Sequence, residues 1–121
     1  MLGAREHLKD AAIHLSYGNF ADSIRESIHA VEAVARTLVK TGALEEALKS
    51  LERNEVIHQA LKKGFSHIYG YTNDEKGIRH PLLNDSHAKV DEADAMFMIG
   101  ACASFVSYML NKARKAGILS T

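Results

Sequence analysis

Apolar residues recur at steps of three and four along most of this chain, and that spacing places them on one face of an α-helix. The clearest example is the segment 20–41, whose apolar stripe consists of Phe20, Ile24, Ile28, Val31, Ala35 and Leu38. Asn19 is suited to cap the start of this helix, and Gly42 is suited to follow its end. No segment shows the apolar–polar alternation of a half-buried β-strand. The sequence therefore predicts an all-α fold.

The same spacing predicts four further helices. They cover residues 2–16, residues 43–51, a segment that starts at the cap Asn54 and ends before Gly70, and residues 91–116. The helix at 43–51 is short, so the expected architecture is an up-and-down bundle of four main helices plus one short helix. A chain of 121 residues suits one modest core, and we expect a single helical domain over residues 1–121. Gly64, inside the fourth helix, is interpreted as a point of close helix–helix approach.

The last predicted helix is apolar around most of its circumference between positions 95 and 110. Asp91, with Asp94 three residues later, marks its start, and Gly117 marks its end. A helix with two apolar faces must cover both of them. We therefore expect one face to pack on the bundle and the other to meet a second subunit or another partner.

Composition narrows the class of protein. Fifteen Lys and Arg residues balance fifteen Asp and Glu residues, which argues against a broad DNA-coating surface but leaves room for a local basic pocket. Cys102, the single cysteine, cannot form an intramolecular disulfide and is expected to be a buried small hydrophobe. The N-terminus lacks the layout of a signal peptide, and no window approaches about 18 uninterrupted apolar residues. We therefore expect a cytoplasmic protein without a membrane span.

The segment of residues 70–89 is the long connection of this chain. Gly70, Gly77 and Pro81, the single proline, interrupt any helical pattern there. A connection of roughly 20 residues is uncommon in a compact domain and is usually functional or disordered. Apolar anchors within it favour the functional interpretation. Its basic residues include Arg79, His80 and His87.

Arg79, His80 and His87 are the residue types needed to cleave RNA without a metal ion. The planar arginine side chain suits a phosphate, and an imidazole can transfer a proton near neutral pH. In such a reaction the 2′-hydroxyl attacks its own phosphate while arginine stabilises the developing charge. The alternative is that an Arg-His pair in a loop is structural. No Gly-x-Ser-x-Gly elbow, Walker loop or dinucleotide fingerprint points to another chemistry.

A polar stripe runs beside the apolar stripe of residues 20–41 and consists of Arg25, His29, Glu32 and Arg36. One interpretation is a solvated face with ion pairs that each contribute little. The functional interpretation is that Glu26 or Glu32 orients a basic group from the long connection. Both interpretations remain open from the sequence.

Two Glu-x-x-His pairs, Glu26/His29 and Glu55/His58, resemble the repeating unit of di-iron helical bundles. Such a site also needs an inward carboxylate from each of two other helices. The last helix has no acidic residue between positions 95 and 116. Because the ligand pattern is only half complete, we expect neither a metal nor another cofactor.

Two stretches of this sequence resemble HEPN domains, the helical modules named for higher eukaryotes and prokaryotes nucleotide-binding. The first stretch, Gly18-Asn19-Phe20 followed by a helix with Glu26 and Glu32, resembles the second helix of the family. The second, residues 69–80 followed by the acid-capped start at Asp91, resembles the C-terminal part of HEPN-like proteins linked to abortive infection. The resemblance spans about residues 2–113.

The resemblance implies a homodimer in which an arginine, a polar residue and a more distant histidine form a ribonuclease site across the interface. Arg79 matches the arginine, His80 the polar residue and His87 the histidine, with Glu26 or Glu32 as orienting groups. Seven residues separate His87 from Arg79, against four to six in the family pattern, so His80 is an alternative acid/base.

The function that the resemblance implies is that of a toxin or phage-defence ribonuclease, with RNA as substrate. It also implies an antitoxin or a nucleotidyltransferase as a further partner. Because many HEPN-like domains are not catalytic, the alternative function is a silent module for dimerisation or for nucleotide or partner binding.

Overall fold

The computed structural model describes residues 2–39, 43–74 and 90–118. These residues form five helices and no strand, which confirms the all-α prediction for this part of the chain. The helices are α1 (Leu2–Ser16), α2 (Phe20–Leu38), α3 (Leu44–Arg53), α4 (Gln59–Asp74) and α5 (Glu92–Lys115).

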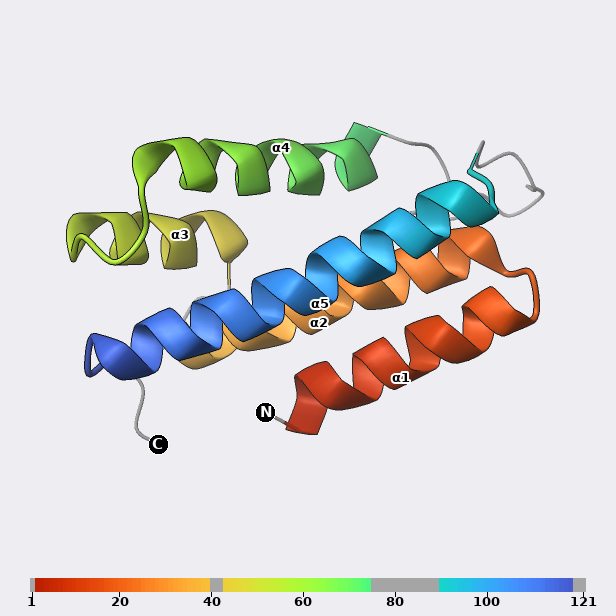
Figure 1. Ribbon diagram of the computed structural model, residues 1–121, viewed down its shortest axis with the longest axis horizontal. Coiled ribbons are helices and arrows are strands. Elements are labelled where there is room, and N and C mark those ends of the chain that lie inside the picture. The colour runs from red at the N-terminus through yellow and green to blue at the C-terminus, as the bar shows by residue number, and fades with distance from the viewer. Residues whose placement is uncertain (1, 40–42, 75–89, 119–121) are drawn as a thin grey trace.

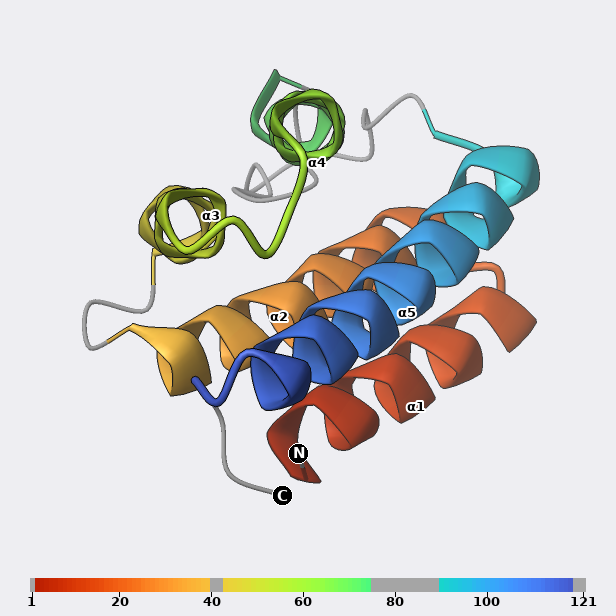
Figure 2. The same ribbon diagram turned by 60° about the vertical axis from the view of Figure 1, so that its left-hand side comes forward.

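α2 is the central helix of the bundle, because it contacts each of the other four. Its most extensive contacts are with α1 and α5, and these three helices lie together (Figure 1). α3 and α4 lie side by side on the opposite side of α2 from α1, with axes inclined to those of α2 and α5 (Figure 2). The fold is therefore a group of three helices covered by a helical pair. The HEPN-like arrangement of four main helices stays a prediction.

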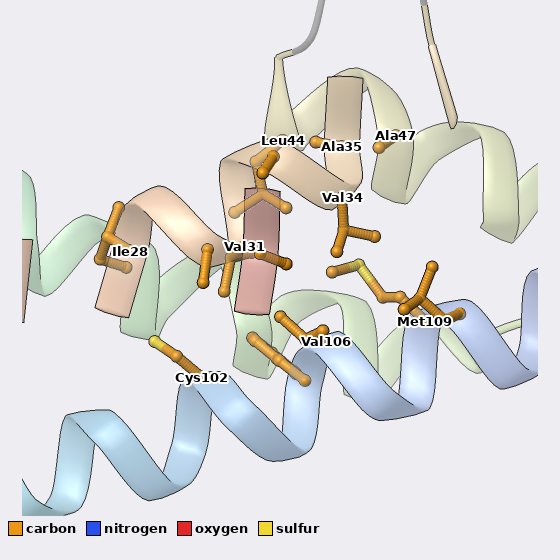
Figure 3. Packing of buried hydrophobic residues seen from close by; sticks show 14 of the residues in the cluster. Ile28, Val31, Val34, Ala35, Leu44, Ala47, Cys102, Val106 and Met109 are labelled. Carbon is orange, nitrogen blue, oxygen red and sulfur yellow. The ribbon is translucent and has the colours of Figure 1, made fainter. Parts of the chain in front are cut away.

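The apolar stripe predicted for the second helix forms the middle of the core. Ile24, Ile28, Val31 and Val34 are all at most 2% exposed, and so are Met98, Cys102 and Met109 of α5. Figure 3 shows Cys102, Val106 and Met109 of α5 facing Ile28, Val31 and Val34 of α2, with Leu44 and Ala47 of α3 above them. Each large side chain buried in this way contributes roughly 1.5–3 kcal/mol to stability.

Small residues hold α1 close to α2. Ala4, Ala11 and Ala30 are essentially unexposed, and the Ser23 hydroxyl donates a hydrogen bond to the Ala11 carbonyl oxygen at 2.8 Å. A Cβ placed on Gly3 would stand 3.8 Å from the Cβ of Ala33. Because no large side chain separates the two backbones, residues at the edges of this contact can reach from one helix to the other.

The ends of α5 are the ones that the sequence predicts. The Asp91 carboxylate accepts a hydrogen bond from the backbone N–H of Asp94, and the Asp94 carboxylate accepts one from the backbone N–H of Asp91, each at 3.0 Å. The first of these bonds holds the pKa of Asp91 below its ordinary value. At the other end Gly117 has a φ of +74°, and the N–H of Ile118 returns to the carbonyl oxygen of Ala113 at 2.9 Å.

The start predicted for the fourth helix is wrong. Asn54 caps the C-terminal end of α3, and Glu55 has a φ of +57°, a conformation usually given to glycine. The N–H of Val56 then bonds to the carbonyl oxygen of Leu51 at 2.8 Å, which closes α3 in the manner of a glycine-ended helix. Because no glycine marks this stop, the sequence pattern did not reveal it. α4 begins at Gln59 instead, after the His58 ring nitrogen accepts a hydrogen bond from the Ala60 N–H at 2.9 Å.

Two predictions about glycines in the fourth helix are also wrong. A Cβ at Gly64 would meet nothing within 4 Å, so this glycine marks no close helix approach. α4 continues through Gly70 to Asp74, with Thr72 fully buried and Tyr69 and Tyr71 packed against the core. The burial of this last turn outweighs the cost of one glycine in a helix, about 1 kcal/mol. Gly42, predicted to follow α2, lies outside the described residues.

The central position of α2 leads to a stability prediction. Replacing the unexposed Ile24 with Ala should lower the free energy of unfolding by roughly 2–5 kcal/mol, because it removes apolar contacts and leaves a cavity. The matched change Ile13→Ala, at a side chain that is 44% exposed, should alter it by only about 0.5 kcal/mol. Urea denaturation followed by circular dichroism measures both. Equal effects of the two changes would contradict the central role of α2.

Candidate functional site

The residues predicted to cleave RNA fall outside the described part of the chain. Arg79, His80 and His87 belong to residues 75–89, between the end of α4 at Asp74 and Val90, just before α5. Of the predicted site residues, the structure describes Glu26 and Glu32, and both lie on α2.

Glu26 lies between two histidines. Its Oε1 atom is 2.7 Å from Nδ1 of His7 on α1, and its Oε2 atom is 3.5 Å from Nδ1 of His29 on α2. The two imidazole rings approach edge to face, with their centroids 5.3 Å apart. The side chains of His7, Glu26 and His29 are 32%, 21% and 39% exposed, so the group is partly covered but open to water. One carboxylate thus serves two imidazoles, each through a different oxygen.

The pairing of α1 with α2 brings His7 to Glu26. The turn at residues 17–19 reverses the chain, and the Ser23 hydroxyl then bonds to Ala11. One helical turn back from Ala11 lies His7, and nearly one turn forward from Ser23 lies Glu26, so the two side chains meet across the seam. Sequence reasoning missed His7. The signal was the short turn at 17–19 together with small residues on both helices, which together set the register of an antiparallel pair.

Glu32 faces a different neighbour. Its Oε2 atom accepts a hydrogen bond from the hydroxyl of Tyr69 on α4 at 2.9 Å. Glu26 and Glu32 are six positions apart, which places them about 120° apart around a helix. In the structure the Glu26 carboxylate contacts His7 of α1, and the Glu32 carboxylate contacts Tyr69 of α4. The structure therefore does not bring the two predicted orienting groups to one place.

The rest of the polar stripe on α2 includes an ion pair within the helix, in which the guanidinium of Arg25 contacts the carboxylate of Asp22. Arg36 is exposed. The side chains of the polar stripe thus contact different partners and do not form one continuous polar surface.

The second Glu-x-x-His pair does not share a helical face. Glu55 follows the end of α3 in a left-handed conformation, and His58 precedes α4 with its ring bonded to the Ala60 N–H. The placement of Glu55 and His58 on one helical face was therefore wrong, because it required a helix that begins at Asn54. Among the described residues, His7, Glu26 and His29 form the one group with three potential metal-binding side chains whose donor atoms all lie within 4.8 Å of one another.

The outward face of α5 combines large apolar with small side chains. Near its start Met96 and Phe97 are 57% and 61% exposed. Small exposed residues follow on the same face, at Gly100, Ala103, Ser104 and Ser107. A shallow groove lies along the C-terminal part of the same face, lined by Ala103, Ser104, Ser107, Tyr108, Asn111, Lys112 and Lys115. The described chain leaves this second face of α5 uncovered.

Among the helices that the structure describes, α5 alone is long and apolar enough to cross a membrane, by length and composition only. Buried residues of α5, such as Met98 and Met109, belong to the core of the bundle. The core helix of a soluble protein meets the same criteria, so this finding is weak evidence for a membrane span.

Cys102 is the small buried hydrophobe that the sequence predicts. It is unexposed, and burial raises the pKa of its thiol to about 12. A thiol in this environment stays protonated at neutral pH and is a poor nucleophile.

Comparison of the chain with protein-family models, with curated proteins and with solved structures finds no match. The HEPN resemblance therefore stays a prediction, and any function has to be argued from the side chains themselves.

The burial of Cys102 predicts a selective thiol reactivity. At pH 8 the native protein should not react with a thiol-specific reagent such as dithionitrobenzoate, because the pKa of the thiol is raised to about 12 and the sulfur has no access to solvent. The unfolded protein in guanidinium should release one equivalent of the coloured product. The matched variant Ser16→Cys, with a second thiol at an exposed position on α1, should react at once in the folded state. Fast labelling of native wild-type protein would contradict the burial of Cys102.

Proposed function

We propose that this chain is a self-associating helical module whose outward α5 face packs against the same face of a second copy. The observation that supports the proposal is the exposure of Phe97 and Met96, at 61% and 57%, on a helix whose other face is already in the core. Two large apolar side chains exposed next to each other, beside small residues, are typical of an interaction surface.

A second copy is the occupant that best suits this face. The start of α5 is acidic, with Asp91, Glu92 and Asp94, and its last turn is basic, with Lys112, Arg114 and Lys115. If the α5 helices of two copies pack antiparallel, the acidic start of each helix lies beside the basic end of the other. A two-fold axis at Ser104 places Asp94 opposite Arg114 and Phe97 opposite Asn111, so that Phe97 of each copy meets the groove near Tyr108 of the other. The face is thus self-complementary in both charge and shape.

In this arrangement the protein functions as a dimeric binding module, which agrees with the silent members of the family that it resembles. The positions of Glu26 and Glu32 favour this function over catalysis. Each acid already has a partner within the bundle, and the two lie on different sides of α2.

The second candidate function is the metal-independent endoribonuclease of a toxin or phage-defence protein, with Arg79 and either His87 or His80 as its reacting groups. The observation that favours it is that α5 begins just after residues 75–89 and exposes Phe97 within its first two turns. If two copies crossed at Phe97, each Val90 would lie roughly 10 Å along the helix from the crossing point. In the antiparallel overlay centred on Ser104, the two Val90 residues would instead be about 40 Å apart.

The two arrangements predict different disulfide cross-links. Light scattering should give twice the monomer mass of 13.3 kDa for the wild type. In the antiparallel dimer centred on Ser104, each Ser104 lies opposite the Ser104 of the other copy, whereas Phe97 lies opposite Asn111. Because a disulfide needs Cβ atoms roughly 3.5–4.5 Å apart, Ser104→Cys should form an intermolecular disulfide on mild oxidation and Phe97→Cys should not. Native Cys102 is unexposed and should give no background.

A monomeric wild type at concentrations near 100 μM would contradict self-association, on the scale of affinities expected for such a contact. Cross-linking of Phe97→Cys in place of Ser104→Cys would contradict the overlay and favour the arrangement that the ribonuclease requires.

RNA cleavage in EDTA tests the second candidate function. If the chain is a ribonuclease, labelled RNA should be cut in the presence of chelator, and Arg79→Ala should lower the rate at least about 100-fold by removing the group that stabilises charge on the phosphate. His87→Ala and His80→Ala then assign the acid/base, since the change that abolishes cleavage identifies the histidine in use. Cleavage by wild type no faster than by Arg79→Ala would leave the dimeric binding module as the function.

A further inference from the structure

We propose that His7, Glu26 and His29 bind one divalent transition-metal ion, with Zn²⁺ as the expected ion. The site joins α1 to α2 on the outside of their contact. It has no ligand on α5, so it is independent of the self-association proposed above.

The donor set is one that transition metals select. Two imidazoles and one carboxylate are the protein ligands of many catalytic zinc sites and of iron sites with open positions, and imidazole suits zinc, copper, iron and nickel. Glu26 and His29 are three positions apart on α2, which places their side chains on the same side of one helical turn. His7 supplies the third ligand from α1, at a position held by the close packing of the two helices.

The distances are close to those of a bound state. Ligand bonds of 2.0–2.2 Å in a tetrahedral zinc site put neighbouring donor atoms roughly 3.2–3.6 Å apart. Here the two Nδ1–carboxylate separations are 2.7 Å and 3.5 Å, and all three residues offer donor atoms within 4.8 Å of one another. To hold an ion, the 2.7 Å hydrogen-bond separation between His7 and Glu26 must open by roughly 0.5–0.9 Å, and both histidine rings are partly exposed.

The exposure of the three side chains determines the kind of site. With 21–39% of each side chain exposed, water has access to the fourth position of a tetrahedral ion. The ion would bind as a three-ligand centre with one open position. Since the ligands come from two helices, binding also clamps α1 onto α2, and it stabilises the folded state because the unfolded chain does not hold the three groups together.

This one-ion site differs from the di-iron unit that the Glu-x-x-His pairs of the sequence resemble. A di-iron bundle needs two Glu-x-x-His pairs with further inward carboxylates, whereas here one pair and a histidine from the neighbouring helix suffice for one ion. Glu26, predicted to orient a basic group of the connection, acts in this proposal as a metal ligand.

Titration with Co²⁺ and Zn²⁺ tests the proposal. One equivalent of Co²⁺ should give the intense visible absorption of a tetrahedral site, and Zn²⁺ should displace it. At about 100 times the dissociation constant, Zn²⁺ should raise the melting temperature by roughly 5–10 °C. His29→Ala should remove both effects. His67→Ala changes an exposed histidine of α4 and should preserve them.

Glu26→Gln separates the loss of a ligand from the loss of structure, because the amide keeps the size of the side chain and can still bond to His7. It should keep the helical circular dichroism spectrum and weaken Co²⁺ binding at least about 10-fold, as expected when an anionic ligand is lost.

The wild type offers a test that needs no variant: in long-range ¹H–¹⁵N NMR spectra, the imidazole signals of His7 and His29 should be the ones that move with one equivalent of Zn²⁺. Movement of other histidines alone, or Co²⁺ absorption that survives His29→Ala, would overturn the proposal.

Discussion

The structure depends on the burial of α2 from several sides at once. Its branched residues, such as Val31 and Val34, pack toward α5 and α3, and its small residues, such as Ser23 and Ala30, allow α1 to approach closely. Because four other helices contact α2, little of its surface is exposed to solvent. Glu26 and Glu32 therefore extend into seams between helices, where each finds a partner from another element. The candidate metal site is a consequence of this crowding, because a carboxylate at the edge of a close helix contact is within reach of a histidine from the next helix.

α5 meets a related constraint in a different way. Its inward residues complete the core, while its outward face carries Phe97 and a row of small side chains with charges confined to the two ends. The capping box at Asp91 and the glycine turn at Gly117 determine where this helix begins and ends, and the packing of its buried side chains determines which residues face outward. An apolar outward face without internal charge can pack against an identical face without burying an unpaired ion. The proposed self-association and the proposed metal site thus involve different helices and have separate physical origins.

Much of the fold could be predicted from the sequence, and much less of the candidate site. The apolar stripes located α1, α2 and α5 to within a few residues, because helical periodicity is a local property. The start of α4 was misplaced because the turn after α3 has Glu55 in a left-handed conformation. A glycine usually occupies such a position, and without one the sequence did not show the turn. Glu26 was predicted to orient a basic group of the connection, and its contacts with His7 and His29 were not foreseen. His7 lies nineteen positions away in the chain, and its role depends on the register of two helices.

The sequence by itself determined the helical class, the apolar stripe of α2 around Ile24, Ile28 and Val31, both ends of α5 and the burial of its single cysteine. These features follow from side-chain type and spacing within one element, which periodicity and capping chemistry report directly. Only the tertiary structure decided which polar groups meet. It separated Glu26 from Glu32 by placing them against different helices, removed Glu55 and His58 from a shared face, and brought His7 to Glu26 and His29. The reason is geometric: contacts across two helices depend on how closely their backbones approach, and here small residues in the seam, such as Ala11 beside Ser23 and Gly3 beside Ala33, keep the two backbones close.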